Sequence, residues 1–351
     1  MELNTAEKLF YAKQIMLPDV GIEGQLKLKN TRVLCIGAGG LGSPLLQTLV
    51  SAGIGKIGIV DHDVVELSNL QRQILYRYED VNLKKVSIAK KYLQKLNPHI
   101  DIVVYPEKFD VSNARELIAQ YDIIADCTDY LANRYLVNQI CMELNKSFVF
   151  AGIWQHQGQC MLFQGKQGPC FECLFPADST AEVLSDCNEL GVLAVLPNLL
   201  GTLQANLIIQ HVLKLQNSLP QYFYHIDISN LEFRPYSVEQ NLQCRVCGVN
   251  KIAYPAINII SIETLKHKLA NTENFILLDV RSREEHEIQN LGGILIPLPE
   301  LSSRIAELDP AIPVIVYCRT DVRSQMAAHI LCENNFTSVA YLKGGITAWT
   351  T

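Results

Sequence analysis

The sequence has 351 residues, of which 48% are hydrophobic and 19% are charged, and its formal net charge is −6. This composition is typical of folded domains with sizeable cores, and the length favours two domains. The negative net charge gives no support to nucleic-acid binding, which usually requires a basic face.

The N-terminal segment and the cysteines indicate the compartment. Residues 1–18 mix charges into a helical pattern and lack the apolar segment of a signal peptide. The eleven cysteines are then expected to be free thiols, metal ligands or catalysts in a reducing cytoplasm. The most apolar stretch, residues 190–215, is interrupted by polar side chains, so it predicts buried helices rather than a membrane span. We expect no membrane partner.

From residue 31 onwards, short β-branched runs alternate with longer stretches of helical period. The expected strands lie within residues 32–40, 56–63, 99–106, 121–129 and 147–153. This alternation predicts an α/β fold with a doubly wound, mostly parallel sheet. A turn-rich segment with cysteines follows at residues 164–178.

The α/β pattern starts again after residue 248. Helices are expected at residues 260–269 and 324–334, and strands at residues 275–282, 313–318 and 338–345. A unit of this length is a usual size for one domain. We therefore expect domains at 1–250 and 259–351, joined by a linker at 251–258.

A glycine-rich loop closes the first expected strand and opens a helix. It contains Gly37, Gly39, Gly40 and Gly42 with the spacing G-x-G-x-x-G. Glycines let a backbone approach phosphates, and the helix N-terminus favours negative charge. Asp61 ends the next strand about 20 residues later, where a ribose hydroxyl is usually held. This pattern alone leaves NAD, FAD and ATP open as ligands.

Polar and basic side chains follow Asp61 closely. Asn69, Arg72 and Gln73 come directly after it, and Lys85 stands at the start of a predicted helix. An arginine and a lysine there would neutralise a triphosphate, which a nicotinamide cofactor does not need. Taken singly, each could be a solvated loop residue.

Two aspartates, Asp126 and Asp129, end the fourth expected strand, at the sheet edge where a Mg²⁺ ligand belongs. Five motifs now stand in order along the chain: GAGGLGSP, DHDVVELSNLQRQ, KKVSIAK, NPHI and DCTD. Together they resemble the adenylating domain of the MoeB/ThiF family, relatives of ubiquitin-activating enzymes. The resemblance covers roughly residues 5–248.

This resemblance implies that the glycine loop binds ATP, that Asp61 holds the ribose, and that Arg72 and Lys85 contact the phosphates. Asp129 matches the aspartate linked to Mg²⁺, and a homodimer is implied. The sequence departs from the family at Lys13, where an arginine usually reaches into the ATP site of the partner subunit. Lysine keeps the charge but loses the bidentate fork, so contact with phosphate and simple solvation both stay open.

Two C-x-x-C pairs indicate a metal. They are Cys170 with Cys173 and Cys244 with Cys247. Four thiolates suit a closed, structural Zn²⁺ site, and two pairs in a cytoplasmic protein make this more specific than one redox pair. The MoeB/ThiF family also binds zinc with such pairs.

Cys187 lies in a polar segment before the apolar helices. It matches the family cysteine that forms a thioester in conjugating relatives and assists sulfur transfer in others, although a spare thiol is the alternative. Five further cysteines fall in strand or helix patterns and are assigned to packing: Cys35, Cys127, Cys141, Cys160 and Cys332.

Cys318 follows a strand and precedes a helix, so backbone N–H groups and the helix dipole are expected to stabilise an anionic persulfide there. Arg319 and Arg323 would add positive charge. Four residues separate Cys318 from Arg323, one fewer than in cysteine phosphatases, which favours a ring around one sulfur atom. The segments FILLDVRSREEHEI, IPLPEL, PVIVYCRTDVRS and YLKGGITAW resemble a single rhodanese domain. Asp321 and Val322 depart from the commoner loop of this family, so an inactive, purely structural rhodanese domain is the alternative.

The two resemblances together predict an ATP-dependent adenylyltransferase and sulfurtransferase. The expected partner is a ubiquitin-like sulfur-carrier protein ending in Gly-Gly, and the expected sulfur donor is a persulfide or thiosulfate. The carrier protein would receive a C-terminal thiocarboxylate, which would supply sulfur for molybdopterin synthesis, thiamin synthesis or tRNA thiolation. The alternatives are a thioester-forming activating enzyme that uses Cys187, with a non-catalytic rhodanese domain, and a nicotinamide oxidoreductase.

Overall fold

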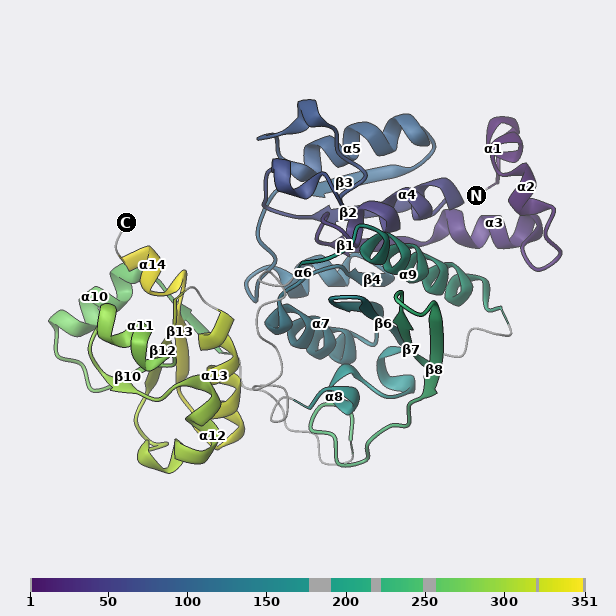
Figure 1. Ribbon diagram of the computed structural model, residues 1–351. Helices are drawn as coiled ribbons and strands as arrows, with labels where there is room; N and C mark the ends of the chain where they lie inside the picture. The colour runs from purple at the N-terminus through teal and green to yellow at the C-terminus, as the bar shows by residue number, and fades with distance from the viewer. Residues whose placement is uncertain (1, 177–190, 216–221, 249–256, 320–321, 350–351) are drawn as a thin grey trace. The chain divides into compact units, whose positions relative to one another are not determined.

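The computed structural model describes residues 2–176, 191–215, 222–248, 257–319 and 322–349 (Figure 1). These residues fall into two compact units, each built around its own sheet. The expected linker at 251–258 lies mostly outside the described residues, so its limits stay a prediction.

The first unit contains an eight-stranded sheet in the order β3-β2-β1-β4-β5-β6-β7-β8. The first five strands in this order, namely β3, β2, β1, β4 and β5, are parallel, as the alternating sequence pattern predicts. Their bounds are β1 Arg32–Ile36, β2 Lys56–Val60, β3 Asp101–Tyr105, β4 Ile123–Asp126 and β5 Ser147–Trp154. The expected doubly wound α/β fold is thus confirmed.

Helices cover both faces of this sheet, with α4, α5 and α9 on one face and α6 and α7 on the other (Figure 1). Their bounds are α1 Thr5–Phe10, α2 Ala12–Ile15, α3 Gly21–Asn30, α4 Gly42–Ala52, α5 Lys85–Leu96, α6 Ala114–Ala119, α7 Leu131–Leu144, α8 Phe171–Leu174 and α9 Val195–Leu213. Short 3₁₀ helices are η1 Leu67–Asn69, η2 Tyr78–Asp80 and η3 Gly165–Gln167.

The apolar stretch at 190–215 forms one helix, α9, where the sequence suggested more than one. It packs on α4, β5 and β6. Its Gln204 is completely buried and donates from Nε2 to the carbonyl of Asp126 at 2.8 Å. This polar residue within the apolar stretch therefore binds the helix to the sheet. Among the described helices, none is both long and apolar enough to cross a membrane.

Three antiparallel strands extend the parallel sheet, and sequence patterning did not predict them. They are β6 Gln157–Phe163, β7 Tyr222–Asp227 and β8 Glu232–Ser237. In β8 all residues but the first are exposed, so this edge strand lacks the buried apolar run that identifies the central strands.

The second unit has a five-stranded, all-parallel sheet in the order β11-β10-β12-β13-β9. The strands are β9 Asn258–Ile260, β10 Ile276–Asp279, β11 Ile294–Leu295, β12 Val314–Tyr317 and β13 Val339–Leu342. The helices are α10 Ile262–Ala270, α11 Arg283–Ile288, α12 Leu301–Arg304, α13 Val322–Glu333 and α14 Gly345–Trp349, with 3₁₀ helices η5 Leu298–Glu300 and η6 Ile305–Glu307. The expected helices and strands are all present, while β9 and β11 were not foreseen.

Candidate functional site

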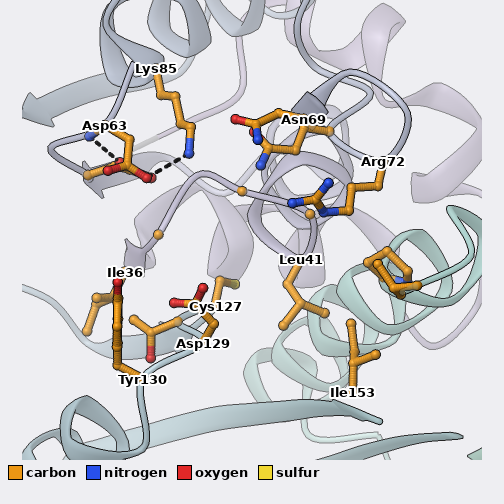
Figure 2. Close-up of a pocket in the computed structure, with 18 of the residues that line it drawn as sticks. Ile36, Leu41, Asp63, Asn69, Arg72, Lys85, Cys127, Asp129, Tyr130 and Ile153 are labelled. Atoms are coloured by element: carbon orange, nitrogen blue, oxygen red, sulfur yellow. Dashed lines mark hydrogen bonds and ion pairs between the residues drawn. The ribbon is translucent and has the colours of Figure 1, made fainter. Parts of the chain in front are cut away.

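A cavity of about 600 Å³ opens at the carboxyl edge of β1, β2 and β4 (Figure 2). Its lining combines the glycine loop with the polar and basic residues singled out in the sequence. Of the residues expected to bind nucleotide, those that line it are Gly37, Gly39, Gly40, Asp61, Asn69, Arg72, Gln73, Lys85 and Asp129. Ligands of open α/β sheets bind at this edge.

The glycine loop is shaped by its lack of side chains. Gly37 has a φ of +92°, and a Cβ built on it would lie 2.8 Å from the carbonyl oxygen of Cys127. A Cβ on Gly42 would collide with the Gly37 carbonyl. The loop therefore keeps its tight turn only with glycine at both positions, and the cavity beside it stays open for phosphates.

Asp61 fixes the loop as well as facing the cavity. Its Oδ2 accepts from the amide of Ala38 at 2.8 Å, and its Oδ1 accepts from the amide of Asp63 at 2.8 Å. The hydroxyl of Tyr76 donates to the Ala38 carbonyl at 2.7 Å. A carboxylate oxygen has further lone pairs, so these bonds leave Asp61 able to accept from a ribose hydroxyl.

The basic side chains surround the same space. Lys85 is 6% exposed, and its Nζ lies 2.8 Å from Oδ2 of Asp63 (Figure 2). Arg72 donates from a terminal nitrogen to the Ser68 carbonyl at 3.0 Å, which leaves other guanidinium N–H groups toward the cavity. Gln73 is buried, and its Oε1 has no hydrogen-bond partner among the described residues.

The two aspartates after β4 differ in environment. Asp126 is completely buried, and its Oδ1 accepts from the amide and hydroxyl of Thr128 at 3.0 and 2.7 Å. Asp129 lines the cavity, and desolvation by the surrounding protein raises the pKa of its carboxyl. A carboxylate in that place is a suitable oxygen ligand for Mg²⁺. Asp126, already enclosed, is the poorer candidate.

Of the expected nucleotide-binding residues that the structure describes, Gly42 and Lys13 are absent from the lining of this cavity. Lys13 is exposed on α2 and is absent from the lining of its own chain's cavity. Its neighbour Gln14 fixes α2 by donating to Oε1 of Gln25 at 2.6 Å and to the carbonyl of Ala52 at 2.9 Å. Cys187 lies outside the described residues.

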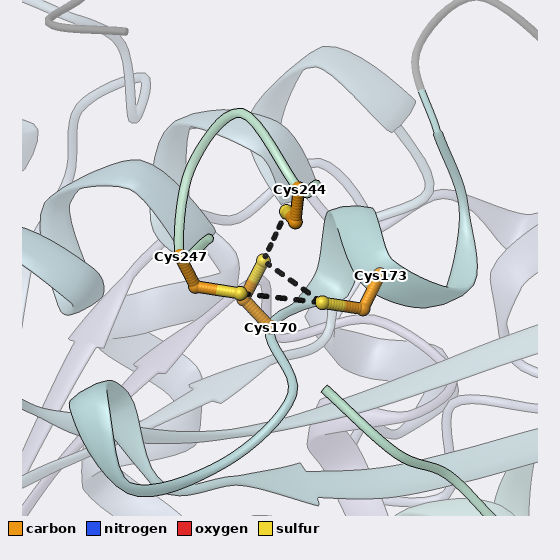
Figure 3. Close-up of side chains that lie close together, drawn as sticks. All are labelled: Cys170, Cys173, Cys244 and Cys247. Atoms are coloured by element: carbon orange, nitrogen blue, oxygen red, sulfur yellow. Dashed lines mark hydrogen bonds between the residues drawn. The ribbon is translucent and has the colours of Figure 1, made fainter. Parts of the chain in front are cut away.

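The four cysteines of the C-x-x-C pairs converge, although Cys170 and Cys244 are 74 positions apart in the sequence (Figure 3). Their Sγ atoms are 3.5 Å apart for Cys170 and Cys244, 3.2 Å for Cys173 and Cys247, and 4.0 Å for Cys170 and Cys173. A tetrahedral Zn²⁺ with bonds of about 2.3 Å places sulfur atoms about 3.8 Å apart. The cluster therefore fits the metal predicted from the sequence.

In the second unit, Cys318 directly follows β12 and is only 1% exposed. Its Sγ lies 3.5 Å from Oγ of Ser324, and its carbonyl accepts from the amide of Ile346 at 2.9 Å. Asp279 accepts from Arg281 and His286, which agrees with a structural role for this aspartate. Thr320 and Asp321 lie outside the described residues. Asp321 is one of the two residues at which the sequence departs from the commoner rhodanese loop.

The charge beside Cys318 is smaller than the sequence suggests. Both terminal nitrogens of Arg323 donate to the carboxylate of Glu285, at 2.6 and 2.7 Å. These hydrogen bonds lower the pKa of Glu285 to about 2. Arg323 is therefore neutralised by a residue of α11 that sequence reasoning missed, because the pair is 38 positions apart and no local pattern marks it.

The chain matches two families. Residues 11–246 match the ThiF family and residues 261–351 match the rhodanese-like domain. A probable molybdopterin-synthase adenylyltransferase of Porphyra purpurea is 36% identical over 352 residues, which cover 97% of this chain and 92% of the relative. The adenylyltransferase and sulfurtransferase MOCS3 of Arabidopsis thaliana is 34% identical, covering 97% of this chain and 82% of the relative.

Two further likenesses cover about two thirds of the chain. A sulfur carrier protein adenylyltransferase of Thermus thermophilus is 42% identical over 243 residues, covering 68% of this chain and 90% of the relative. The crystal structure of E. coli MccB with ATP is similar with a TM-score of 0.58 and 26% identity, over 64% of this chain and 68% of that chain.

Proposed function

Because the chain belongs to the ThiF family and carries a C-terminal rhodanese-like domain, we propose that it is an adenylyltransferase and sulfurtransferase that acts on a ubiquitin-like sulfur-carrier protein. The observation that carries the proposal is the cavity, where a glycine loop, two cationic side chains and a carboxylate share one sheet edge. Relatives whose names include adenylyltransferase and sulfurtransferase match 97% and 99% of this chain, so the likeness includes both domains.

In the first step, the C-terminal carboxylate of the carrier attacks the α-phosphate of ATP, and pyrophosphate leaves. Arg72 and Lys85 stabilise the charge that develops on the phosphates, since fixed cations in a desolvated cavity act strongly on developing charge. Asp129 is the residue that would hold Mg²⁺, which supplies further neutralisation of the phosphates. The glycine loop of Gly37 and Gly42 and the carboxylate of Asp61 orient the nucleotide.

In the second step, a persulfide on Cys318 attacks the acyl-adenylate, AMP leaves, and an acyl disulfide forms. The thiol of Cys187 then attacks the Cys318 sulfur, which releases the thiocarboxylate and leaves a disulfide between the two cysteines. The sulfur arrives on Cys318 from a persulfide or from thiosulfate.

The cysteine cluster of the first unit supports a structural zinc site. Its four thiolates would fill a tetrahedral coordination sphere, which leaves no open position for substrate. None of the ten cysteines in the described part of the chain forms a disulfide, which supports a cytoplasmic location. The relative named for molybdopterin synthase favours molybdenum cofactor biosynthesis among the possible pathways.

We also expect a homodimer in which Lys13 reaches the ATP site of the partner subunit. Apolar side chains are exposed on and around the N-terminal helices: Leu9, Phe10, Met16, Leu17 and Ile22. Several exposed apolar side chains within one short segment favour a protein interface. The exposed position of Lys13 on α2, outside its own cavity, supports a contact with another chain.

The test is a pull-down of the carrier from cell extract, followed by intact-mass measurement of carrier and enzyme after ATP and a sulfur donor are added. A thiocarboxylate on the carrier supports the proposal, whereas a carrier held on Cys187 by a thioester supports the conjugating alternative. Cys318→Ala should abolish thiosulfate sulfurtransferase activity and leave ATP–pyrophosphate exchange intact. Continued sulfur transfer by this variant would refute the role of Cys318.

A further inference from the structure

Arg134 lies in the first turn of α7, and its side chain, 13% exposed, lines the cavity. No sequence motif singles it out. A cation in this position is disfavoured by the positive end of the helix dipole. Its burial there therefore requires compensating contacts.

Those contacts join two neighbouring strands. One terminal nitrogen of Arg134 donates to the carbonyl of Thr128 at 3.1 Å and to the carbonyl of Ala151 at 3.3 Å. The guanidinium carbon lies 4.8 Å from the centre of the Phe150 ring, a cation–π distance. Thr128 follows β4, and the other two residues belong to β5, so one side chain links the turn after β4 to the adjacent strand.

The same turn is held from its other side by Asp126. Oδ1 of Asp126 accepts from both the amide and the hydroxyl of Thr128. Its Oδ2 is completely buried and lies 3.9 Å from Nε of Arg134, and neither of these two atoms has a hydrogen-bond partner among the described residues. Asp126 thus balances the buried positive charge electrostatically while it binds the turn.

Thr128 is consequently held at its amide, its hydroxyl and its carbonyl. That carbonyl belongs to the peptide bond joining Thr128 to Asp129, so fixing it also fixes the direction in which the Asp129 backbone leaves the turn. We infer that Arg134 is a positioning residue that holds the Asp129 carboxylate toward Mg²⁺ and the ATP phosphates. This inference rests on the adenylation proposed above.

Arginine suits this role better than lysine. The planar guanidinium can stack on a ring while it donates in its own plane to two carbonyl oxygens, whereas an ammonium is a point charge without a flat face. Arg134→Lys should therefore keep the balance with Asp126 but lose part of the hold on Thr128. We expect its effect to lie between the wild type and Arg134→Met.

The test measures binding of ATP to the full chain by isothermal titration calorimetry, once in excess Mg²⁺ and once in EDTA. In the wild type, Mg²⁺ should strengthen ATP binding. In Arg134→Met this Mg²⁺-dependent gain should fall about tenfold or more, as is usual when support for a metal ligand is lost. Binding of metal-free ATP should change much less.

The chain offers a matched control in Arg77. It also donates to two carbonyls, those of Ile74 and Tyr76, and stacks over a ring, that of Tyr92 at 5.4 Å, but it does not line the cavity. Arg77→Met should leave the Mg²⁺-dependent gain unchanged. An equal loss in both variants would overturn the inference, because it would mean that any such arginine supports the fold in general.

Stability is separated from positioning by a second variant. Arg134→Met leaves the Asp126 carboxylate buried without a counter-charge, which destabilises the fold. The double variant Asp126→Asn with Arg134→Met removes this charge, while the amide oxygen of the substituted side chain is still available to Thr128. It should melt closer to the wild type and still lack the Mg²⁺-dependent gain. Restoration of that gain together with stability would overturn the inference.

A double-mutant cycle with Asp129→Asn decides whether Arg134 acts through Asp129. If it does, Asp129→Asn and Arg134→Met each remove the gain, and their combination removes no more than either alone. Effects that add would overturn the inference. If the wild type binds no ATP at all, the proposed function fails instead, so the two failures are distinguishable.

Discussion

Gly37→Ala tests whether the glycine loop has the conformation that the cavity requires. The residue closes β1, and its amide donates to the Val60 carbonyl at 2.9 Å, which sets the start of the loop. With a φ of +92°, it occupies backbone space that L-residues rarely adopt. An added Cβ would also lie 2.8 Å from the carbonyl oxygen of Cys127, a backbone atom that has little freedom to move.

Both effects destabilise the folded state. Strained backbone of this kind costs about 1–2 kcal/mol, and overpacking costs about 1–3 kcal/mol. We expect the free energy of unfolding to fall by about 3 kcal/mol, and a domain of this size then melts roughly 6–12 °C lower. Relief of the contact would also shift the end of β4, and with it the turn that leads to Asp129, so ATP binding should weaken.

Gly39→Ala in the same loop is the matched control. There the nearest atom to an added Cβ is Nε2 of the Gln73 side chain, 3.5 Å away, an ordinary contact. This variant should melt within about 1 °C of the wild type, but bind ATP more weakly because the methyl group enters the cavity. Scanning calorimetry of the full chain is run with and without ATP. The unfolding transition of the ATP-binding domain is the one whose melting temperature rises when ATP is added. Equal melting temperatures for Gly37→Ala and the wild type would refute the argument.

Three further predictions concern other sites. Cys244→Ser should reduce the zinc content below one equivalent per chain, as measured by mass spectrometry of the metal, and should destabilise the first unit. A full zinc content in this variant would contradict the four-thiolate site. Glu285→Gln should destabilise the second unit near neutral pH. Since Arg323 lowers the pKa of Glu285 from 4.5 to about 2, this difference in the free energy of unfolding should be complete above about pH 5 and disappear as the pH falls toward 2. Lys13→Ala should slow ATP–pyrophosphate exchange, and an unchanged rate would show that Lys13 does not serve the partner's site.

Much of the fold could be predicted because its central strands carry buried β-branched runs between helical segments. Strands β1, β2, β4 and β5 follow this rule, and so do β10, β12 and β13. The edge strand β3 is less buried and was predicted from its β-branched residues alone. The other edge strands give a weaker signal: β8 is mostly exposed, and β9 and β11 have three residues and two residues. Short or exposed strands depend on pairing with a neighbour, so their own residues give little signal.

The five cysteines assigned to packing also follow local patterns. Four of them are buried, namely Cys35, Cys127, Cys141 and Cys160, while Cys332 is partly buried. The structure adds that Cys127 lies at the cavity wall and that its Sγ is 3.9 Å from that of Cys35. Burial raises the pKa of the Cys127 thiol, which agrees with packing rather than chemistry.

The sequence by itself determined the features whose chemistry is carried by neighbouring residues: the glycine loop, each C-x-x-C pair, and Cys318 between a strand and a helix. Only the tertiary structure decided which distant groups meet. It joined the two cysteine pairs, neutralised Arg323 with Glu285, and packed Arg134 against Phe150 and Ala151 of β5. The physical reason is that a short motif needs only local geometry, whereas a buried charge needs a partner, and that partner is supplied by whichever strand or helix the fold packs against it.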